Sequence, residues 1–276
     1  MGLKARLGRR AMIAGVGSVP IHAARAAAGK VFDSHFHVID PRFPLFENQG
    51  YTPPPFPLDT YLDKARPLAI AGGAVVSGSF QGYDQTYLLD TLARLGSGWV
   101  GVAQIPPDMP DAEIAHLAAA GVRALRFNVA RGEVADLDSI IALARRAHDV
   151  AGWHAEFYVD AAQMKPYASR LAALPRLSVD HLGMTEAGLP VLLDLVSAGA
   201  FVKATGFGRV SMDVGKALEA IAARNPGALV FGTDMPSTRA KVPFSPADMT
   251  LIRNVLGPDV AGKVYWDNPV ALYRVG

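Results

Sequence analysis

The sequence predicts one α/β domain with the architecture of a (β/α)8 barrel, and three observations lead to this prediction. Short apolar runs alternate with amphipathic segments, which is typical of parallel α/β folds. Eight such pairs fit between residues 29 and 276, a length close to that of an eightfold barrel. An open doubly wound sheet is the alternative, but the first apolar run lacks the glycine-rich phosphate turn that usually follows it in that fold.

Eight strands are expected from the apolar runs, which are rich in β-branched residues. In chain order they are Val31–Ile39, Gly73–Ser79, Trp99–Gln104, Val122–Asn128, His154–Val159, Leu177–His181, Phe201–Thr205 and Leu229–Asp234.

A helix is expected after each strand, and several of the helices carry start or stop signals. Asp111 follows Pro110 at one predicted start, while Gly121, Gly152, Gly199 and Gly257 follow predicted ends. The expected helices are Asp59–Ala71, Asp84–Leu95, Asp111–Ala120, Leu137–Ala151, Ala161–Leu174, Glu186–Ala198, Met212–Asn225 and Pro246–Leu256.

The composition narrows the function classes. Half of the 276 residues are hydrophobic, 19% are charged and the formal net charge is +2, so a large core can form and nothing favours a nucleic-acid partner. The chain contains no cysteine, which excludes disulfides and thiolate chemistry. A small molecule is therefore the expected partner, and the sequence is compatible with a homo-oligomer.

The first 28 residues have the composition of an export signal. A basic start is followed by the moderately apolar run AMIAGVGSVPIHAA and by small residues suited to Ala-x-Ala cleavage, with no acidic residue before Asp33. The Arg9-Arg10 pair resembles a twin-arginine signal. We therefore expect a leader at 1–28, a single domain at 29–276, and a periplasmic or secreted protein with no other membrane contact. The alternatives are a basic tail and a cytoplasmic location.

The segment FDSHFHVID, residues 32–40, places two histidines one residue apart in the first predicted strand. Strand residues i and i+2 point the same way, so His35 and His37 are expected to lie side by side. The proline-rich and aromatic segment Pro41–Pro57 that follows is expected to be a loop, and its length suggests a lid over a site.

Polar residues recur at the C-terminal ends of the predicted strands, where a barrel of this type builds its active site. Such groups are rarely buried without partners, so their recurrence predicts one shared site. The residues are His35, His37, Ser77, Ser79, Arg126, Arg131, Glu156, Tyr158, Asp180, His181, Lys203, Arg209 and Asp234.

These motifs resemble the amidohydrolase superfamily. Its pattern is HxH on the first strand, a histidine on the sixth (here DHLG) and an aspartate on the eighth (here GTDMP), and the ending WDNPVALY resembles its C-terminal element. The segments FDSHFHVIDP and GVRALRFN are most similar to the branch containing 2-pyrone-4,6-dicarboxylate lactonase and sugar-lactone hydrolases. The resemblance covers the chain from Val31 onwards and implies an amidohydrolase-like barrel.

The resemblance also indicates how many metal ions to expect in the site. Binuclear members of the superfamily have a lysine on strand 4 and a histidine on strand 5, where this chain has Arg126 and Tyr158. A two-metal site is therefore not expected. The lactonase branch is understood to work without metal, and arginines near a site repel a further cation. We expect no cofactor; the alternative is one Zn²⁺ held by His35, His37, His181 and Asp234.

Arginines suggest the substrate, because guanidinium groups bind carboxylates through paired hydrogen bonds. Arg126, Arg131 and Arg209 are predicted to bind a substrate carboxylate, as the corresponding segments do in the branch that this chain resembles. Hydroxyl donors are expected from Tyr51, Ser77, Ser79 and Tyr158. Lys203 could add a further cation but is not assigned to the site.

The resulting hypothesis is hydrolysis of a small carboxylated lactone, such as a pyrone dicarboxylate or a sugar-acid lactone. Asp234 would be the general base for water, and His35, His37 and His181 would donate hydrogen bonds to the developing oxyanion. Three alternatives remain open: a mononuclear zinc decarboxylase of the same superfamily, a lactone isomerase, and a secreted protein that binds organic anions without turning them over.

Overall fold

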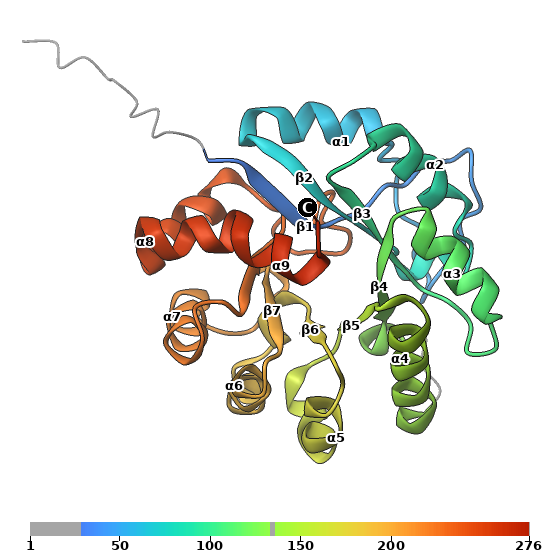
Figure 1. Ribbon diagram of the computed structural model, residues 1–276. Helices are drawn as coiled ribbons and strands as arrows, with labels where there is room; N and C mark the ends of the chain where they lie inside the picture. Colours follow the sequence, from blue (N-terminus) through green and yellow to red (C-terminus); the bar gives the residue numbers. More distant parts are fainter. Residues whose placement is uncertain (1–28, 133–135, 276) are drawn as a thin grey trace, which may run out of the picture.

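The computed structural model describes residues 29–132 and 136–275, and the leader expected at 1–28 lies outside them. Eight parallel strands pair in chain order, each with the next, so the barrel predicted from the sequence is confirmed (Figure 1). The strands are β1 (Val31–Phe36), β2 (Ile70–Val76), β3 (Trp99–Ala103), β4 (Val122–Phe127), β5 (His154–Phe157), β6 (Leu177–Val179), β7 (Phe201–Ala204) and β8 (Leu229–Phe231).

Helices surround the strands on the outside of the barrel (Figure 1). They are α1 (Leu58–Ala65), α2 (Thr86–Leu95), α3 (Asp111–Ala119), α4 (Leu137–Ala151), α5 (Ala168–Ala172), α6 (Leu189–Ser197), α7 (Val214–Arg224), α8 (Pro246–Gly262) and α9 (Asn268–Tyr273). Short 3₁₀ segments follow several strands, among them His181–Gly183 after β6 and Phe207–Arg209 after β7.

One buried carboxylate ties the first strand to the last. Asp33 of β1 accepts hydrogen bonds from Thr233 N at 2.8 Å, Thr233 Oγ1 at 2.7 Å and Tyr61 Oη at 3.0 Å. The backbone continues the seam, because Asp234 N donates to His35 O at 2.7 Å and His37 N donates to Met235 O at 2.8 Å. Two motifs 200 residues apart are thereby brought together at the barrel seam.

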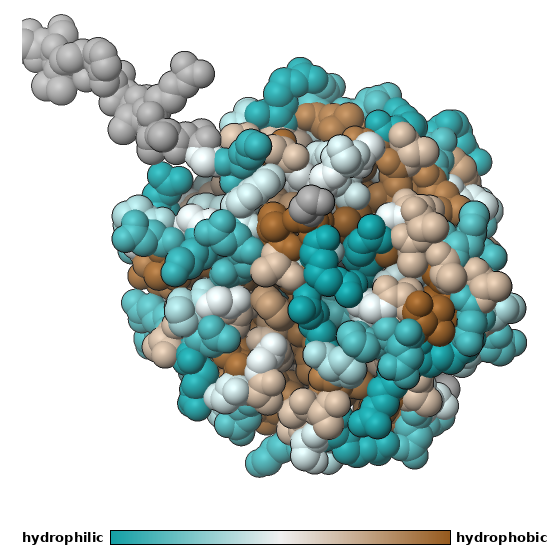
Figure 2. Space-filling model, in the orientation of Figure 1, coloured by the Kyte–Doolittle hydropathy of each residue, from teal (hydrophilic) through white to brown (hydrophobic). Residues whose placement is uncertain are grey.

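The C-terminal helix closes the end of the barrel opposite to the site. The ring of Tyr273 in α9 stacks on Phe32 at 5.5 Å, and its hydroxyl donates to Ser34 O at 3.0 Å. Phe32 belongs to the N-terminal part of β1, whereas His35 and His37 lie toward its other end. Figure 1 looks onto this closed end, and Figure 2 shows the same face as a mixture of hydrophilic and hydrophobic residues.

All eight strands and all eight helices expected from the sequence are present, with shifted boundaries. The helix expected over 59–71 ends at Ala65 because Pro67 interrupts it, and Ile70 already belongs to β2. The one expected over 161–174 contains Pro166 and divides into a 3₁₀ segment and α5. Within the described ranges, no helix is both long and apolar enough to cross a membrane.

Candidate active site

Three side chains of the two joined motifs meet at the C-terminal end of the barrel. The rings of His35 and His37 lie with their centroids 5.1 Å apart, as the strand alternation predicted. Asp234 follows β8, and its Oδ1 lies 3.7 Å from His35 Nε2 and 3.8 Å from His37 Nε2. A Cβ on Gly232 would lie 2.7 Å from the Cβ of His35, so a glycine is required where these strands approach each other.

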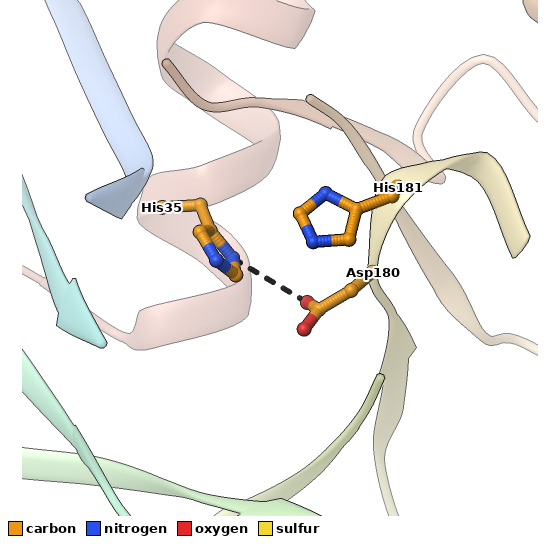
Figure 3. Close-up of side chains that lie close together, drawn as sticks. All are labelled: His35, Asp180 and His181. Carbon is orange, nitrogen blue, oxygen red and sulfur yellow. Dashed lines mark ion pairs between the residues drawn. The ribbon is translucent and has the colours of Figure 1, made fainter. Parts of the chain in front are cut away.

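His181 joins this group from the opposite side of the barrel. It follows β6 with a φ of 51°, and its ring lies 5.0 Å from that of His35. Figure 3 shows His181 and its neighbour Asp180 facing His35 across the barrel, with Asp180 Oδ1 3.5 Å from His35 Nδ1. Gly206 makes room for the ring, because a Cβ there would lie 2.5 Å from His181 Nδ1.

A cavity opens above these groups and is rich in arginine. It is lined by His37, Gly78, Ser79, Phe80, Arg126, Asn128, Arg131, Tyr158, His181, Arg209, Asp234, Thr238 and Arg239. Of the predicted residues, the structure therefore brings together the three arginines, Ser79 and Tyr158 with His37, His181 and Asp234. His35 lies directly beneath them and is fully buried.

Two of the arginines already bind carboxylates of the protein. Arg209 donates to Asp234 Oδ2 through Nε at 3.0 Å and also through Nη2. Arg126 donates to Asp180 Oδ2 at 3.1 Å and 2.9 Å, and to the backbone oxygen of Ser77 at 2.8 Å. Arg131 donates to the hydroxyl of Tyr158 at 2.9 Å. The predicted substrate-binding arginines thus differ: two bind carboxylates of the site itself, and Arg131 binds a hydroxyl.

Two predicted hydroxyl donors do not line the cavity. The hydroxyl of Ser77 is fully buried and contacts Tyr87 Oη at 2.8 Å, which gives it a structural role. Tyr51 lies in the long loop after β1, where Arg239 covers its ring at 4.5 Å. Arg239 also donates to the backbone oxygen of Asn48, so it joins this loop to the segment after β8. The loop is present as expected; its role as a lid stays a prediction.

The three histidines are neutral near pH 7. Burial lowers the pKa of His35, His37 and His181 below the ordinary histidine value, well below for the latter two. The arginines lower it further: Arg126 acts on all three, and Arg209 acts on His37 and His181. For each of the three histidines, burial is a larger cause than the arginines.

The hydrogen bonding of His37 corrects its predicted role. Its Nδ1 lies 2.7 Å from the backbone oxygen of Val76, which can only accept. In the neutral ring the hydrogen is therefore on Nδ1, and Nε2 presents a lone pair toward Asp234. His37 cannot donate to an oxyanion in this form, but it can accept a proton or bind a metal.

A second, fully buried layer lies below the histidines. Lys203 of β7 contacts Glu156 Oε2 at 2.5 Å. The other oxygen of Glu156 accepts from Tyr273 Oη at 2.7 Å and lies 2.9 Å from His154 Nε2. Lys203 is thus part of the barrel interior and does not line the cavity.

Sequence reasoning left several cavity residues unassigned, namely Phe80, Asn128, Thr238 and Arg239. Thr238 and Arg239 follow Asp234 within five residues. This short separation in the sequence could have indicated that they belong to the site. Asp180 was noted beside His181 but was given no role, although it binds Arg126 and faces His35.

The donor atoms fit one metal ion. In a tetrahedral zinc site with bonds of about 2.1 Å, ligand atoms are roughly 3.4 Å apart. The separations of 3.7 and 3.8 Å between Asp234 Oδ1 and the two Nε2 atoms are close to that value. Within the described ranges, Asp234 Oδ1 and His35 Nε2 are buried without a hydrogen-bond partner. A second group of His35, Asp180 and His181 also meets the spacing, but Lys203 Nζ lies 3.5 Å from Asp180 Oδ1 and opposes a cation there.

Known proteins with similar sequences are consistent with this site. The chain is 31% identical over 275 residues to a 4-sulfomuconolactone hydrolase of Rhizobium radiobacter, covering 88% of this chain and 90% of that protein. It is 31% identical over 164 residues to a 2-pyrone-4,6-dicarboxylate hydrolase of Comamonas testosteroni, covering 58% and 53% of the two chains.

Solved structures share the fold. A structure from Agrobacterium tumefaciens superposes with a TM-score of 0.78 at 23% identity, covering 90% of this chain and 97% of the other. A probable 2-pyrone-4,6-dicarboxylic acid hydrolase of Acinetobacter baumannii, solved with citric acid bound, gives 0.78 at 17% identity and covers 89% and 99%. The sequence profile of the Amidohydrolase family matches residues 32–275, and the chain belongs to this family.

Proposed function

We propose that this protein is a hydrolase that opens a small lactone carrying carboxylate or similar anionic groups. The observation that carries the proposal is the cavity in which Asp234 and two neutral histidines lie beside four arginines. Relatives named as sulfomuconolactone and pyrone dicarboxylate hydrolases support the same reaction class.

Asp234 is proposed as the general base, and its two oxygens differ. Oδ2 is held by Arg209, whereas Oδ1 faces the lone pair of His37 Nε2 at 3.8 Å. Two acceptors at this separation suit a water molecule that donates one hydrogen to each. Such a water would be oriented and made more nucleophilic by proton transfer to Asp234.

The proposed reaction adds this water to the lactone carbonyl. The water oxygen bonds to the carbonyl carbon, Asp234 takes the proton, and the oxyanion receives hydrogen bonds from His35 or His181. Cleavage of the ring C–O bond then releases an alkoxide or enolate, to which Asp234 returns the proton. The product is the open acid.

Substrate anions are assigned to Arg131 and Arg239. The guanidinium of Arg126 is occupied by Asp180 and the backbone of Ser77, so its contribution is a fixed positive charge. Among the described residues, Arg131 donates to a tyrosine hydroxyl and not to a carboxylate, and Arg239 lines the same cavity. These two residues are proposed to bind the substrate carboxylate or sulfonate through charge-assisted hydrogen bonds.

We propose that the reaction needs no cofactor. If one Zn²⁺ is bound, His35, His37, His181 and Asp234 would hold it, and it would lower the pKa of a bound water to roughly 7. We also propose that the leader directs export to the periplasm, a proposal that rests on the sequence of residues 1–28 alone.

The test is a product analysis with a panel of pyrone, muconate and sugar-acid lactones, using protein of known metal content before and after chelation. Formation of the open acid by chelated protein is the expected result. Release of CO₂ with one zinc per chain would favour the decarboxylase, and conversion into another lactone would favour the isomerase. Binding of a lactone without any turnover would favour the alternative of a protein that binds organic anions and does not convert them.

A further inference from the structure

Lys203 is the most unusual group that the proposed reaction does not use. Its ammonium is fully buried in the barrel interior, with three polar atoms around it. Nζ is 2.5 Å from Glu156 Oε2, 3.3 Å from His35 Nδ1 and 3.5 Å from Asp180 Oδ1. One of the three neighbours is therefore a ring of the active site.

We propose that Lys203 is a positioning residue that keeps the hydrogen of His35 on Nε2, so that this ring acts as an N–H donor and not as a metal ligand. The proposal rests on the proposed lactone hydrolysis and specifies how its site is held. An ammonium can only donate, so its contact with Nδ1 requires the lone pair of His35 at that atom. The hydrogen is then on Nε2, which faces Asp234 and the cavity side.

The alternative form of His35 is available in the same structure. If the hydrogen were on Nδ1, it would point to Asp180 Oδ1 at 3.5 Å, the contact drawn in Figure 3. Among the described residues this oxygen has no hydrogen-bond partner. That arrangement, a carboxylate holding a histidine whose other nitrogen is free, is the usual support of a metal-binding histidine.

Lys203 decides between the two forms because of its position. With Nδ1 protonated, a ring N–H would face the ammonium at 3.3 Å, and both donors would compete for Asp180 Oδ1, which lies 3.5 Å from each. Glu156 keeps the ammonium in place and is itself fixed by Tyr273 and His154 on its other oxygen. The barrel interior thus selects the donor form of His35, whereas Val76 fixes the lone-pair form of His37.

The test uses the double variant Lys203→Met/Glu156→Gln, which removes the buried charge pair together so that neither charge is left alone. Exposed Lys216 on α7 supplies the control variant Lys216→Met. Three quantities are measured for each protein: zinc affinity by titration of the chelated protein, the ring nitrogen of His35 that carries hydrogen by ¹⁵N NMR, and kcat and KM for an anionic lactone.

In the wild type and the control, the hydrogen of His35 is expected on Nε2 and zinc binding should be weak. In the double variant the hydrogen should move to Nδ1, and zinc should bind about 10- to 100-fold more tightly, the usual effect of a residue that orients a metal ligand. With zinc absent, kcat should fall while KM changes little.

An unchanged hydrogen position, or an unchanged zinc affinity, in a folded double variant would overturn the proposal. Lys203→Arg is the second variant: if it fails to keep the wild-type hydrogen position while folding normally, a cation at this place is not the determinant. A wild-type protein that opens no lactone would overturn the proposed function alone, because the zinc and NMR results do not depend on turnover.

Discussion

Two of the buried ion pairs in the described part of the barrel, Arg209–Asp234 and Lys203–Glu156, differ in what surrounds them. Arg209 and Asp234 line the cavity, and within the described chain Asp234 Oδ1 has no hydrogen-bond partner. Lys203 and Glu156 lie below, and both oxygens of Glu156 have protein partners. The upper pair leaves an acceptor available for chemistry, whereas the lower pair is complete and can only hold other groups in place.

The largest effect is expected for the upper pair. Asp234→Asn removes the proposed base while keeping the size of the side chain, so kcat should fall by about 10²- to 10⁴-fold, the usual contribution of a general base. The measurement is steady-state hydrolysis of an anionic lactone, with the melting temperature as control. Near wild-type turnover in this variant would remove Asp234 from the mechanism.

For the lower pair the effect should be on stability. Lys203→Met leaves Glu156 buried without its cation, whereas Asp180 keeps Arg126, and breaking a buried pair costs about 3–5 kcal/mol. Urea denaturation should show this loss, while the double variant with Glu156→Gln should recover a large part of it. Equal losses for the single and double variants would show that the pair is not an electrostatic unit.

The lower pair should also make the protein sensitive to acid. Burial raises the pKa of Glu156, but attraction to Lys203 and a hydrogen bond with His154 outweigh it and bring the pKa to about 2. A lowered pKa contributes stability above the ordinary carboxyl value of 4.5, and that contribution is lost as the pH falls toward 2.

We therefore expect the stability advantage of the wild type over Lys203→Met/Glu156→Gln to shrink between pH 4.5 and pH 2. The pKa of buried Asp33 is raised to about 6 and acts in the opposite direction, but Asp33 is present in both proteins and its contribution cancels. Unfolding free energies measured across this range provide the check. A difference that stays constant with pH would contradict the assigned pKa of Glu156.

Substitutions of two cavity arginines should also have different effects, one on substrate binding and the other on stability. Arg131→Met should lower kcat/KM for an anionic lactone by about 10- to 100-fold, corresponding to a charge-assisted hydrogen bond of about 1.5–3 kcal/mol. The uncharged methyl ester should be affected little. Arg126→Met should instead lower stability and impair both substrates, because Arg126 binds Asp180. Equal losses on both substrates in Arg131→Met would remove it from substrate binding.

The smallest effects are expected for Ser77 and Ser79, the two serines that follow β2. Ser77→Ala removes a buried hydrogen bond to Tyr87 and should cost about 1 kcal/mol in stability with little change in KM. Ser79→Ala lies at the cavity and should raise KM with little change in stability. Chemical denaturation and kinetics on both variants decide between them, and a reversed pattern would place Ser77 in contact with substrate.

The sequence predicted the architecture well because periodicity and turn residues report local structure. It also placed His35, His37, His181 and Asp234 together, because corresponding strand ends meet at one end of a barrel. The form of each histidine was not predictable, since it depends on a neighbour far along the chain: Val76 for His37 and Lys203 for His35.

The partners of the arginines were also not predictable from the sequence. A guanidinium binds a substrate carboxylate and a protein carboxylate equally well, so residue type alone did not distinguish Arg131 from Arg126 or Arg209. Only the three-dimensional arrangement shows that Asp180 lies close enough to bind Arg126 and that Asp234 lies close enough to bind Arg209.

The most direct test of the central claim is the ratio of kcat/KM for a carboxylated or sulfonated lactone to that for its methyl ester, measured with chelated wild-type protein. A site built from Asp234 beneath several arginines predicts formation of the open acid and a strong preference for the anionic substrate. Equal rates for the two substrates, or no opening of any anionic lactone, would contradict it.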